Sequence, residues 1–297
     1  MSNLFEVGAA ISEISLASEV KKEACETDKS KIVCADQIFN HIFEQITQKD
    51  YTSHLGRHLE IHEGKFCWYD DNGKLFMVDG KLEPNNTYEL NGAKYQTDEN
   101  GRIIKCEAHP EKTPENSRDI EAQTEAGGKD RRDGDQGGHV LSRDLGGDAG
   151  KGNLVAMDSK INQSDYKRME NAVKKSLDEG NDVTTETEIS YSGDSDRPDK
   201  ITTTVYENGE KKSTYTFDNN LDGSLMDKVK ETCDKSDVEM VDSVKNEVGG
   251  EISSIREDFD KDGNLDKTTV TITYVDENGS NRRTTVVIDH GRGGDTT

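Results

Sequence analysis

Asn-Gly pairs recur between short runs of aliphatic, aromatic and β-branched residues, and they constrain the fold more than any other local signal. The pairs stand at residues 72–73, 91–92, 100–101, 208–209 and 278–279. Asn-Gly supplies two consecutive residues that accept positive φ, which suits a tight turn between neighbouring antiparallel strands. The chain is therefore predicted to form a short antiparallel meander over residues 63–108, with further hairpins over 183–217 and around Asn278.

The beginning of the chain has a different periodicity. Apolar residues recur every three or four positions from Ala10 to Val20, and a second run over residues 35–46 repeats this spacing. Such spacing gathers apolar side chains on one face of a helix. We therefore expect a helical segment ahead of the first hairpins.

The apolar content limits the size of any core. Hydrophobic residues make up 30% of the 297 residues and charged residues 33%, which is poor in apolar residues for one large globule. We expect small cores joined by solvated segments in an α+β protein. Its regions would be a helical N-terminal segment (1–62), a central domain (63–219) and an acidic, β-rich C-terminal region (220–297).

Charge is unevenly distributed. The formal net charge is −23, whereas proteins that bind nucleic acid are usually basic, because phosphate neutralisation supplies most non-specific affinity. Residues 118–180 contain 11 Lys and Arg against 13 Asp and Glu, a net charge of −2. The remaining −21 lies in the flanks, which are expected to weaken any affinity for nucleic acid.

Cysteine usage and hydropathy bear on the compartment. The five cysteines are widely spaced and form no CxxC pair, which favours free thiols in a protein made in a reducing compartment. No stretch approaches the ~20 apolar residues needed to span a membrane. The N-terminus lacks a basic n-region and reaches Glu6 at once, so synthesis in the cytoplasm without a Sec signal is expected.

The residues that carry chemistry lie in the middle of the chain. Gly137 and Gly138 precede His139, whose imidazole titrates near neutral pH and can take a proton from water. Glycines permit backbone geometry that other residues resist, so a strand or turn can hold this imidazole in a cleft. Asn162 and Glu170 lie eight residues apart, about two helical turns, and hence near one face. An amide oxygen suits Mg²⁺, which keeps most of its waters.

This constellation resembles the DNA/RNA non-specific endonuclease family, in the version found as toxin domains of bacterial polymorphic effectors. That family has a Gly-His on the second strand of a ββα-metal finger, then two asparagines nine residues apart, and a glutamate eight residues further on. His139, Asn153, Asn162 and Glu170 stand at these positions with both spacings kept. The resemblance covers about residues 63–218 and implies a ββα-metal nuclease domain.

The resemblance also implies roles. His139 would activate a water, Asn162 would bind the metal, Glu170 would orient a metal-bound water, and Asn153 would support the site by hydrogen bonding. The cofactor would be Mg²⁺, with Mn²⁺ as the alternative, and the enzyme would hydrolyse phosphodiester bonds of DNA and/or RNA. The toxin version further implies export as an effector and a cognate immunity protein.

The chain departs from the family at one position. Many relatives have Asp-Arg-Gly-His, with the arginine on phosphate, whereas Gln136 lies in that vicinity here. A substitute cation is needed. We favour Arg143, with Arg197 or the Arg131–Arg132 pair as alternatives.

Two weaker patterns carry alternatives. His54, His58 and His62 recur every four residues and would form a metal-binding stripe, or merely an exposed face, on a helix. The run Asp258, Asp260, Asp262 and Gly263 resembles the start of a calcium loop, but Thr269 stands where a bidentate Glu is required. A turn leading into a hairpin is the favoured interpretation of that run.

A second function class stays open on the sequence. The charge of −23 and the missing arginine beside His139 favour a non-catalytic acidic interaction protein with a nuclease-like remnant. The joint spacing of the four family positions favours the enzyme.

Overall fold

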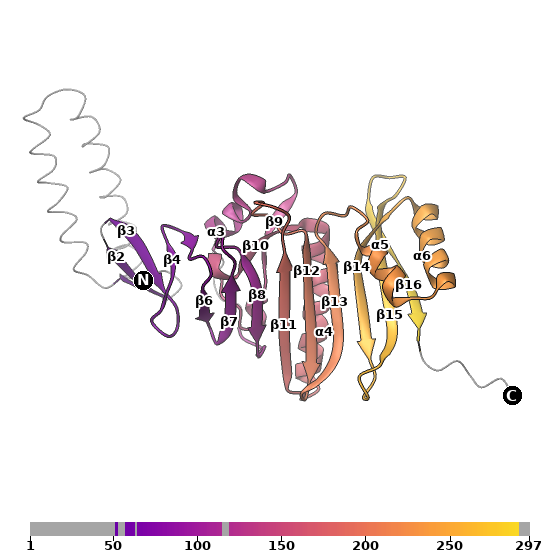
Figure 1. Cartoon of the computed structure of the whole chain (residues 1–297), viewed down its shortest axis with the longest axis horizontal. Helices are drawn as coiled ribbons and strands as arrows, with labels where there is room; N and C mark the ends of the chain where they lie inside the picture. The colour runs from indigo at the N-terminus through magenta and orange to yellow at the C-terminus, as the bar shows by residue number, and fades with distance from the viewer. Residues whose placement is uncertain (1–50, 53–56, 63, 115–118, 291–297) are drawn as a thin grey trace, which may run out of the picture.

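The computed structural model describes residues 51–52, 57–62, 64–114 and 119–290 (Figure 1). Most of the predicted N-terminal helical segment lies outside these ranges. Where that segment is described, the helical prediction was wrong, because β1 (Tyr51–Thr52) and β2 (His58–His62) are paired strands. The α+β class is confirmed. No helix in the described ranges is long and apolar enough to cross a membrane.

A small antiparallel sheet opens the described chain, with its strands in sequence order. After β1 and β2 come β3 (Lys65–Tyr69), β4 (Leu75–Val78) and β5 (Lys81–Leu82). Leu59 and Ile61 of β2 are buried, while His58 and His62 are exposed with Glu60 between them. The histidines therefore share the outer face of a strand, because alternate side chains of a strand point to one side. The helical stripe was wrong for these two residues, and His54 lies outside the described ranges.

A nine-stranded antiparallel sheet forms the body of the described structure, in the order β16-β15-β14-β13-β12-β11-β8-β7-β6. Its strands are β6 (Thr87–Leu90), β7 (Ala93–Thr97), β8 (Ile103–Ala108), β11 (Val183–Ser190), β12 (Lys200–Glu207), β13 (Glu210–Asp218), β14 (Glu251–Phe259), β15 (Leu265–Val275) and β16 (Asn281–Asp289). Each strand of this sheet pairs with the next strand of the sheet along the chain, although other elements intervene between β8 and β11 and between β13 and β14. The predicted hairpins are confirmed, but the strands of the meander predicted over residues 63–108 are divided between the two sheets.

The first departure from the sheet carries the candidate site. After β8 come α3 (Ile120–Glu125), then β9 (Asp135–His139) and β10 (Leu154–Asp158), which pair only with each other, and then a π-helix, η4 (Ile161–Tyr166), continuous with α4 (Lys167–Asp178). Short 3₁₀ turns, η1 (Gly128–Asp130), η2 (Arg143–Leu145) and η3 (Lys151–Asn153), lie in the connections. The result is a ββα unit packed against the sheet.

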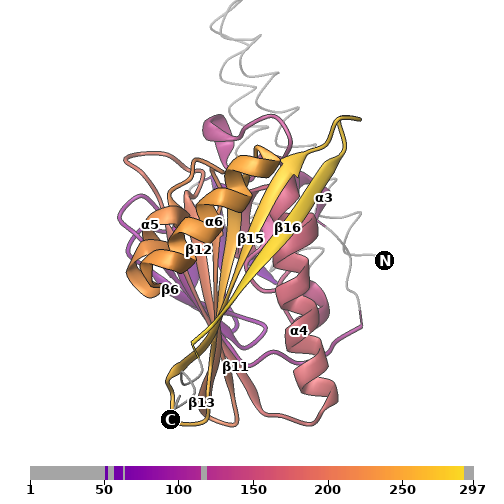
Figure 2. The same ribbon diagram turned by 90° about the vertical axis from the view of Figure 1, so that its right-hand side faces the viewer.

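The second departure adds α5 (Leu225–Thr232) and α6 (Lys235–Val248) before β14. These helices cover the face of the sheet opposite to α4 (Figure 2). Their apolar residues pack on β14, β15 and β16 in a core separate from the larger one beneath the ββα unit. The described ranges thus contain two separate cores, but one continuous sheet joins them, because β13 pairs with β14, where solvated connecting segments were predicted.

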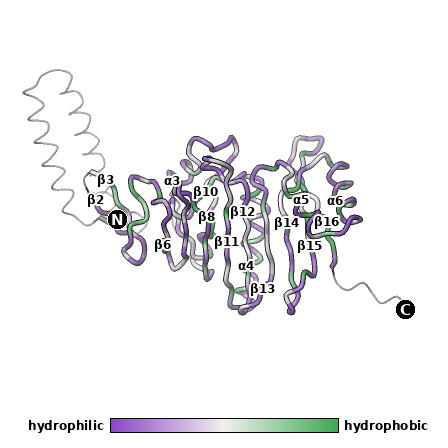
Figure 3. The backbone as a smooth tube through the Cα atoms, in the orientation of Figure 1, coloured by the Kyte–Doolittle hydropathy of each residue, from purple (hydrophilic) through white to green (hydrophobic). Residues whose placement is uncertain are grey.

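Polar residues dominate the chain along most of its path, with hydrophobic residues in short stretches (Figure 3). This pattern follows from strands that bury alternate residues, as in β11, where every second residue is buried. Such strands need few apolar residues per unit length. An apolar content of 30% is therefore enough for an extended sheet with helices on part of each face.

The same aspartate-headed turn closes four of the hairpins. In each, an Asp carboxylate accepts hydrogen bonds from the backbone N–H groups two and four residues later, and a glycine with positive φ follows at the third position. The aspartates are Asp70, Asp98, Asp260 and Asp276. The DxDxDG run at 258–263 is thus the hairpin turn between β14 and β15, and the calcium-loop alternative has no support in its geometry.

The cysteines in the described ranges behave as expected from their spacing. Cys67, Cys106 and Cys233 are free thiols. The other two lie outside the described ranges.

Candidate active site

A polar cavity of about 610 Å³ lies between α3, the end of β9 and the start of the π-helix. Four of the five residues singled out from the sequence line it: His139, Arg143, Asn162 and Glu170. Gln136, Lys167 and Arg131 contribute further polar groups. His139 and Glu170, which stand 31 positions apart in the sequence, therefore line the same cavity.

Close packing, rather than unusual backbone angles, explains the two glycines before His139. Neither Gly137 nor Gly138 has a positive φ. A Cβ atom on Gly137 would lie 2.5 Å from Cα of Gln123 in α3, and one on Gly138 would lie 2.8 Å from Cε of Met157 in β10. Strand β9 thus packs closely against both α3 and its partner strand β10. This packing fixes the position of His139 at the end of β9.

Asn153 lies behind the cavity and holds its wall. Its side chain is fully buried. The amide oxygen accepts from the Leu141 N–H at 2.8 Å, and the amide nitrogen donates to the Leu141 and Asp148 carbonyls at 2.8 and 2.7 Å. These bonds tie the loop that carries Arg143 to β10. Asn153 therefore positions neighbouring residues and does not line the cavity.

Asn162 and Gln136 form an amide pair inside the cavity. Nδ2 of Asn162 donates to Oε1 of Gln136 at 2.8 Å. This bond engages the amide nitrogen of Asn162, and the oxygen points in a different direction within the same planar amide group. Gln136, which stands near the position where relatives have an arginine, is thus an orienting partner that sequence reasoning noted only as a departure.

Glu170 lies at the inner end of an alternating chain of charges. Lys167 Nζ contacts Glu170 Oε2 at 2.9 Å and Asp144 Oδ2 at 3.8 Å, and Lys174 also contacts Asp144. Burial raises the pKa of Glu170 above its ordinary value, and the charge of Lys167 opposes that rise. Lys167 was missed from the sequence, although its spacing of three residues from Glu170 on a helix was a usable signal.

The arginine candidates fall into different environments. Arg143 is buried and lines the cavity. Arg131 also lines it, while its guanidinium donates to the carbonyls of Gln123, Ala126 and Asp135 at 2.7 to 3.0 Å. Both therefore offer fixed positive charge at the cavity.

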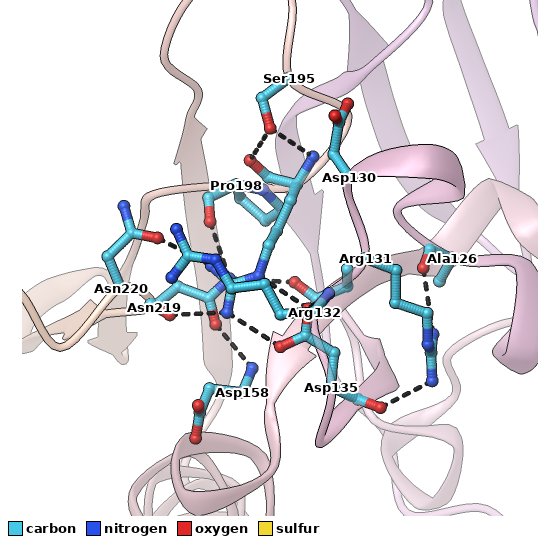
Figure 4. A network of polar contacts seen from close by, with 12 residues as sticks. Ala126, Asp130, Arg131, Arg132, Asp135, Asp158, Ser195, Pro198, Asn219 and Asn220 are labelled. Carbon is cyan, nitrogen blue, oxygen red and sulfur yellow. Dashed lines mark hydrogen bonds and ion pairs between the residues drawn. The ribbon is translucent and has the colours of Figure 1, made fainter.

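Arg197 has a different task. It is 3% exposed and forms two hydrogen bonds with the Asp135 carboxylate, at 2.7 and 2.9 Å, and one with the Asn219 carbonyl at 2.8 Å. Figure 4 labels these two partners, Asp135 and Asn219. The side chain of Asn219 in turn bonds the backbone of β10 at Asp158 and Ala156. Arg197 thus joins β9 to the body of the protein, and its guanidinium is engaged away from the cavity.

The donor set of the cavity suits a hard, strongly hydrated cation. In the described ranges, no three His, Cys, Asp or Glu side chains are placed to hold a metal ion among themselves. An oriented amide oxygen and a partly buried carboxylate that line the same open cavity fit Mg²⁺, which takes few protein ligands and keeps several waters. The residues present therefore fit this cation better than one that needs a closed His or Cys cage.

Fold and site together define an α+β protein in which a ββα unit carries a polar, partly cationic cavity. Comparison with known proteins then gives the family. Residues 84–209 match the family model described as DNA/RNA non-specific endonuclease, so this part of the chain is similar to that family. The resemblance inferred from His139, Asn153, Asn162 and Glu170 is confirmed, since all four lie within the matched segment.

Curated relatives match over short lengths. The chain is 33% identical over 138 residues to the type VII secretion system protein EssD of Staphylococcus aureus, which covers 44% of this chain and 22% of EssD. It is 35% identical over 85 residues to the probable deoxyribonuclease RhsA of Dickeya dadantii, which covers 29% of this chain and 6% of that protein. The chain thus spans less than a quarter of the length of either relative.

Proposed function

We propose that the chain is a metal-dependent, sequence-non-specific nuclease of the ββα-metal kind, which hydrolyses phosphodiester bonds of DNA and/or RNA. The observation that carries this proposal is the cavity itself, where His139, Asn162, Glu170 and Arg143 meet. A base, an amide ligand, a carboxylate and a fixed cation are the groups that phosphodiester hydrolysis requires.

His139 is the general base in this proposal. It takes a proton from a water, whose oxygen attacks phosphorus while the bond to the leaving oxygen breaks. Its place at the end of β9 is set by the packing of Gly137 and Gly138. Mg²⁺, or Mn²⁺ in its place, when bound at the Asn162 amide oxygen would clamp the scissile phosphate and stabilise the leaving oxygen.

The remaining residues orient and neutralise. Glu170 accepts a hydrogen bond from a water in the cavity, and the charge of Lys167 opposes the rise in the pKa of Glu170 that burial causes. Arg143 and Arg131 offer the positive charge that phosphate requires, in place of the arginine that many relatives have where Gln136 and Gly137 lie here. Asn153 holds the loop that carries Arg143.

The biological setting is a proposal from the relatives' names. EssD is named as a type VII secretion system protein and RhsA as a probable deoxyribonuclease. We propose that this chain is an exported effector that acts as a bacterial toxin, and that its producer carries a cognate immunity protein.

The deciding experiment is cleavage of plasmid DNA and of RNA with Mg²⁺, with and without EDTA, by wild type and His139→Ala. We expect cutting that chelator abolishes and that His139→Ala lowers by about 10²–10⁴-fold. His109→Ala, which alters an exposed histidine outside the cavity, is the control and should cut normally. A folded wild type that cuts neither substrate would favour the acidic interaction protein instead.

A further inference from the structure

The π-helix at the start of α4 faces two parts of the protein at once. Asn162 lines the cavity, while Asp165, three residues later in the same turn, is buried on another side. Eight residues of a regular α-helix overshoot two full turns by about 80°. A π turn is wider and rotates through a smaller angle per residue about the helix axis. It therefore brings Asn162 and Glu170 closer to one line parallel to that axis.

Asp165 is a buried carboxylate held by donors from the C-terminal region. Its Oδ2 accepts from the hydroxyls of Ser253 at 2.5 Å and Ser254 at 3.0 Å. Its Oδ1 accepts from Arg168 Nη2 at 2.5 Å and from Ser164 at 3.2 Å. A buried carboxylate is costly unless it is paired and hydrogen-bonded, so these donors fix where this turn can lie.

A second irregularity makes this contact possible. Consecutive residues of a regular strand point to opposite faces, yet Ser253 and Ser254 both reach Asp165. The register of β14 against β15 shifts between Ile252 and Ser254, which is a β-bulge. Bulges re-aim side chains and are frequent beside active sites. A π turn and a β-bulge, each a departure from regular structure, therefore meet at one carboxylate.

Further contacts join the same elements. Arg168, one turn from Asp165 on the helix, also contacts the Thr271 hydroxyl of β15 at 3.5 Å. The Ser253 hydroxyl lies 3.4 Å from the Thr271 carbonyl. The turn that carries Asn162 is thus bound to two strands that lie beyond the segment matched by the nuclease family.

We infer that Asp165 is a positioning residue for Asn162, and that the C-terminal region takes part in building the metal site through Ser253 and Ser254. This inference rests on the proposed nuclease function. Without the serine hydroxyls, the carboxylate must find other donors, and the turn that presents Asn162 moves with it. The region after residue 219 then has a role in catalysis that its acidity does not suggest.

The test uses the full chain with Ser253→Ala and Ser254→Ala together. Ser176→Ala is the matched control, since Ser176 is a buried serine on the same α4 helix that donates to Glu207 at 2.6 Å. The measurements are the Mg²⁺ concentration for half-maximal cleavage, the thermal unfolding midpoint, and the NMR signals of the Asn162 side-chain amide, assigned by their loss in Asn162→Ala. The NMR signals need neither metal nor substrate.

In the double variant we expect the half-maximal Mg²⁺ concentration to rise about 10-fold or more, as for groups that orient a metal ligand. The Asn162 amide signals should shift. Ser176→Ala should lower the unfolding midpoint without either effect. If the double variant does not fold, Ser254→Ala alone, which removes the longer of the two serine bonds, takes its place.

Unchanged Asn162 signals and an unchanged Mg²⁺ titration in a folded variant would overturn the inference while wild-type cleavage stands. A wild type that neither cuts nor responds to metal overturns the proposed function instead. The amide signals still decide in that case whether the serines position Asn162.

Discussion

A buried ion pair between Asp135 and Arg197 fixes the beginning of the strand that ends at His139 (Figure 4). Burial by itself would raise the pKa of Asp135, but hydrogen bonds and the charge of Arg197 prevail and hold that pKa below its ordinary value. At the scale of the residue, the site thus depends on side chains that never enter the cavity.

The depressed pKa of Asp135 predicts a pH dependence of stability. Its stabilising contribution is fully present above the pKa of the unfolded carboxyl, about 3.9, and is lost as the pH falls through the lower folded value. At pH 7, Asp135→Asn should lower the free energy of unfolding by about 3–5 kcal/mol, because Arg197 is left buried without its counter-charge. Urea denaturation at pH values from 7 to 3 measures the difference in the free energy of unfolding between wild type and Asp135→Asn. This difference should shrink below about pH 4, and a difference that stays constant would contradict the prediction.

Asn162 gives a prediction about metal dependence. Asn162→Ala should raise the Mg²⁺ concentration needed for half-maximal cleavage, and activity should partly recover at high Mg²⁺, because substrate phosphate and waters supply the other ligands. Asn171→Ala, an exposed asparagine on the same helix, serves as control. An unchanged Mg²⁺ titration in Asn162→Ala would place the ligand elsewhere.

At the scale of the element, the ββα unit depends on how closely its parts approach. Strands β9 and β10 pair in register from Asp135 opposite Asp158 to His139 opposite Leu154. Helix α3 lies against β9 at Gly137, where no Cβ atom fits. The geometry of the cavity is therefore set by backbone contacts as much as by the residues that line it.

Gly137→Ala should separate α3 from β9. The added Cβ would meet Cα of Gln123 at 2.5 Å and its carbonyl oxygen at 2.6 Å, and overpacking of this kind costs about 1–3 kcal/mol. Cleavage should fall together with the thermal midpoint. Gly180→Asn is the control, since that glycine has a φ of +85° and nothing within 4 Å of an added Cβ, and asparagine tolerates this conformation. Equal stability of wild type and Gly137→Ala would show that α3 can shift to make room for the added Cβ atom at little cost in free energy.

At the scale of the whole molecule, the acidic C-terminal region and the nuclease segment share one sheet. Strand β14 pairs with β13 over Ser213–Phe217, and its serines bond the helix of the site. Surplus carboxylates in this region repel nucleic acid, yet the contacts make the same region a support. The two effects have opposite consequences for truncation.

A chain ending at Asn219 should unfold at a lower temperature and cut less than the whole chain. Truncation exposes the edge of β13 and removes the two serine donors of Asp165. If repulsion by the acidic region outweighed this support, the truncated chain would instead cut at lower protein concentration, most clearly at low salt, where screening is least. Comparing melting and cleavage of both chains over a range of salt concentrations separates these cases.

Local chemistry in the sequence determined much of this protein. Asn-Gly and Asp-x-Asn-Gly turns fix hairpins within a few residues, so the antiparallel meander was predictable. The spacing of Asn153, Asn162 and Glu170 led to the family, because residues at a fixed spacing on a regular helix or strand lie at fixed positions relative to one another.

Tertiary structure alone decided the rest. Whether His58 and His62 lie on a helix or a strand depends on pairing with β3, which spacing does not reveal. The sequence does not distinguish Arg143, Arg197 and Arg131. Only their burial and their hydrogen-bond partners show which arginine lines the cavity and which one joins strands. The contact of Asp165 with Ser253 and Ser254 joins residues 88 and 89 positions apart through a π turn and a bulge. Such contacts exist only once the sheet has brought its distant strands together.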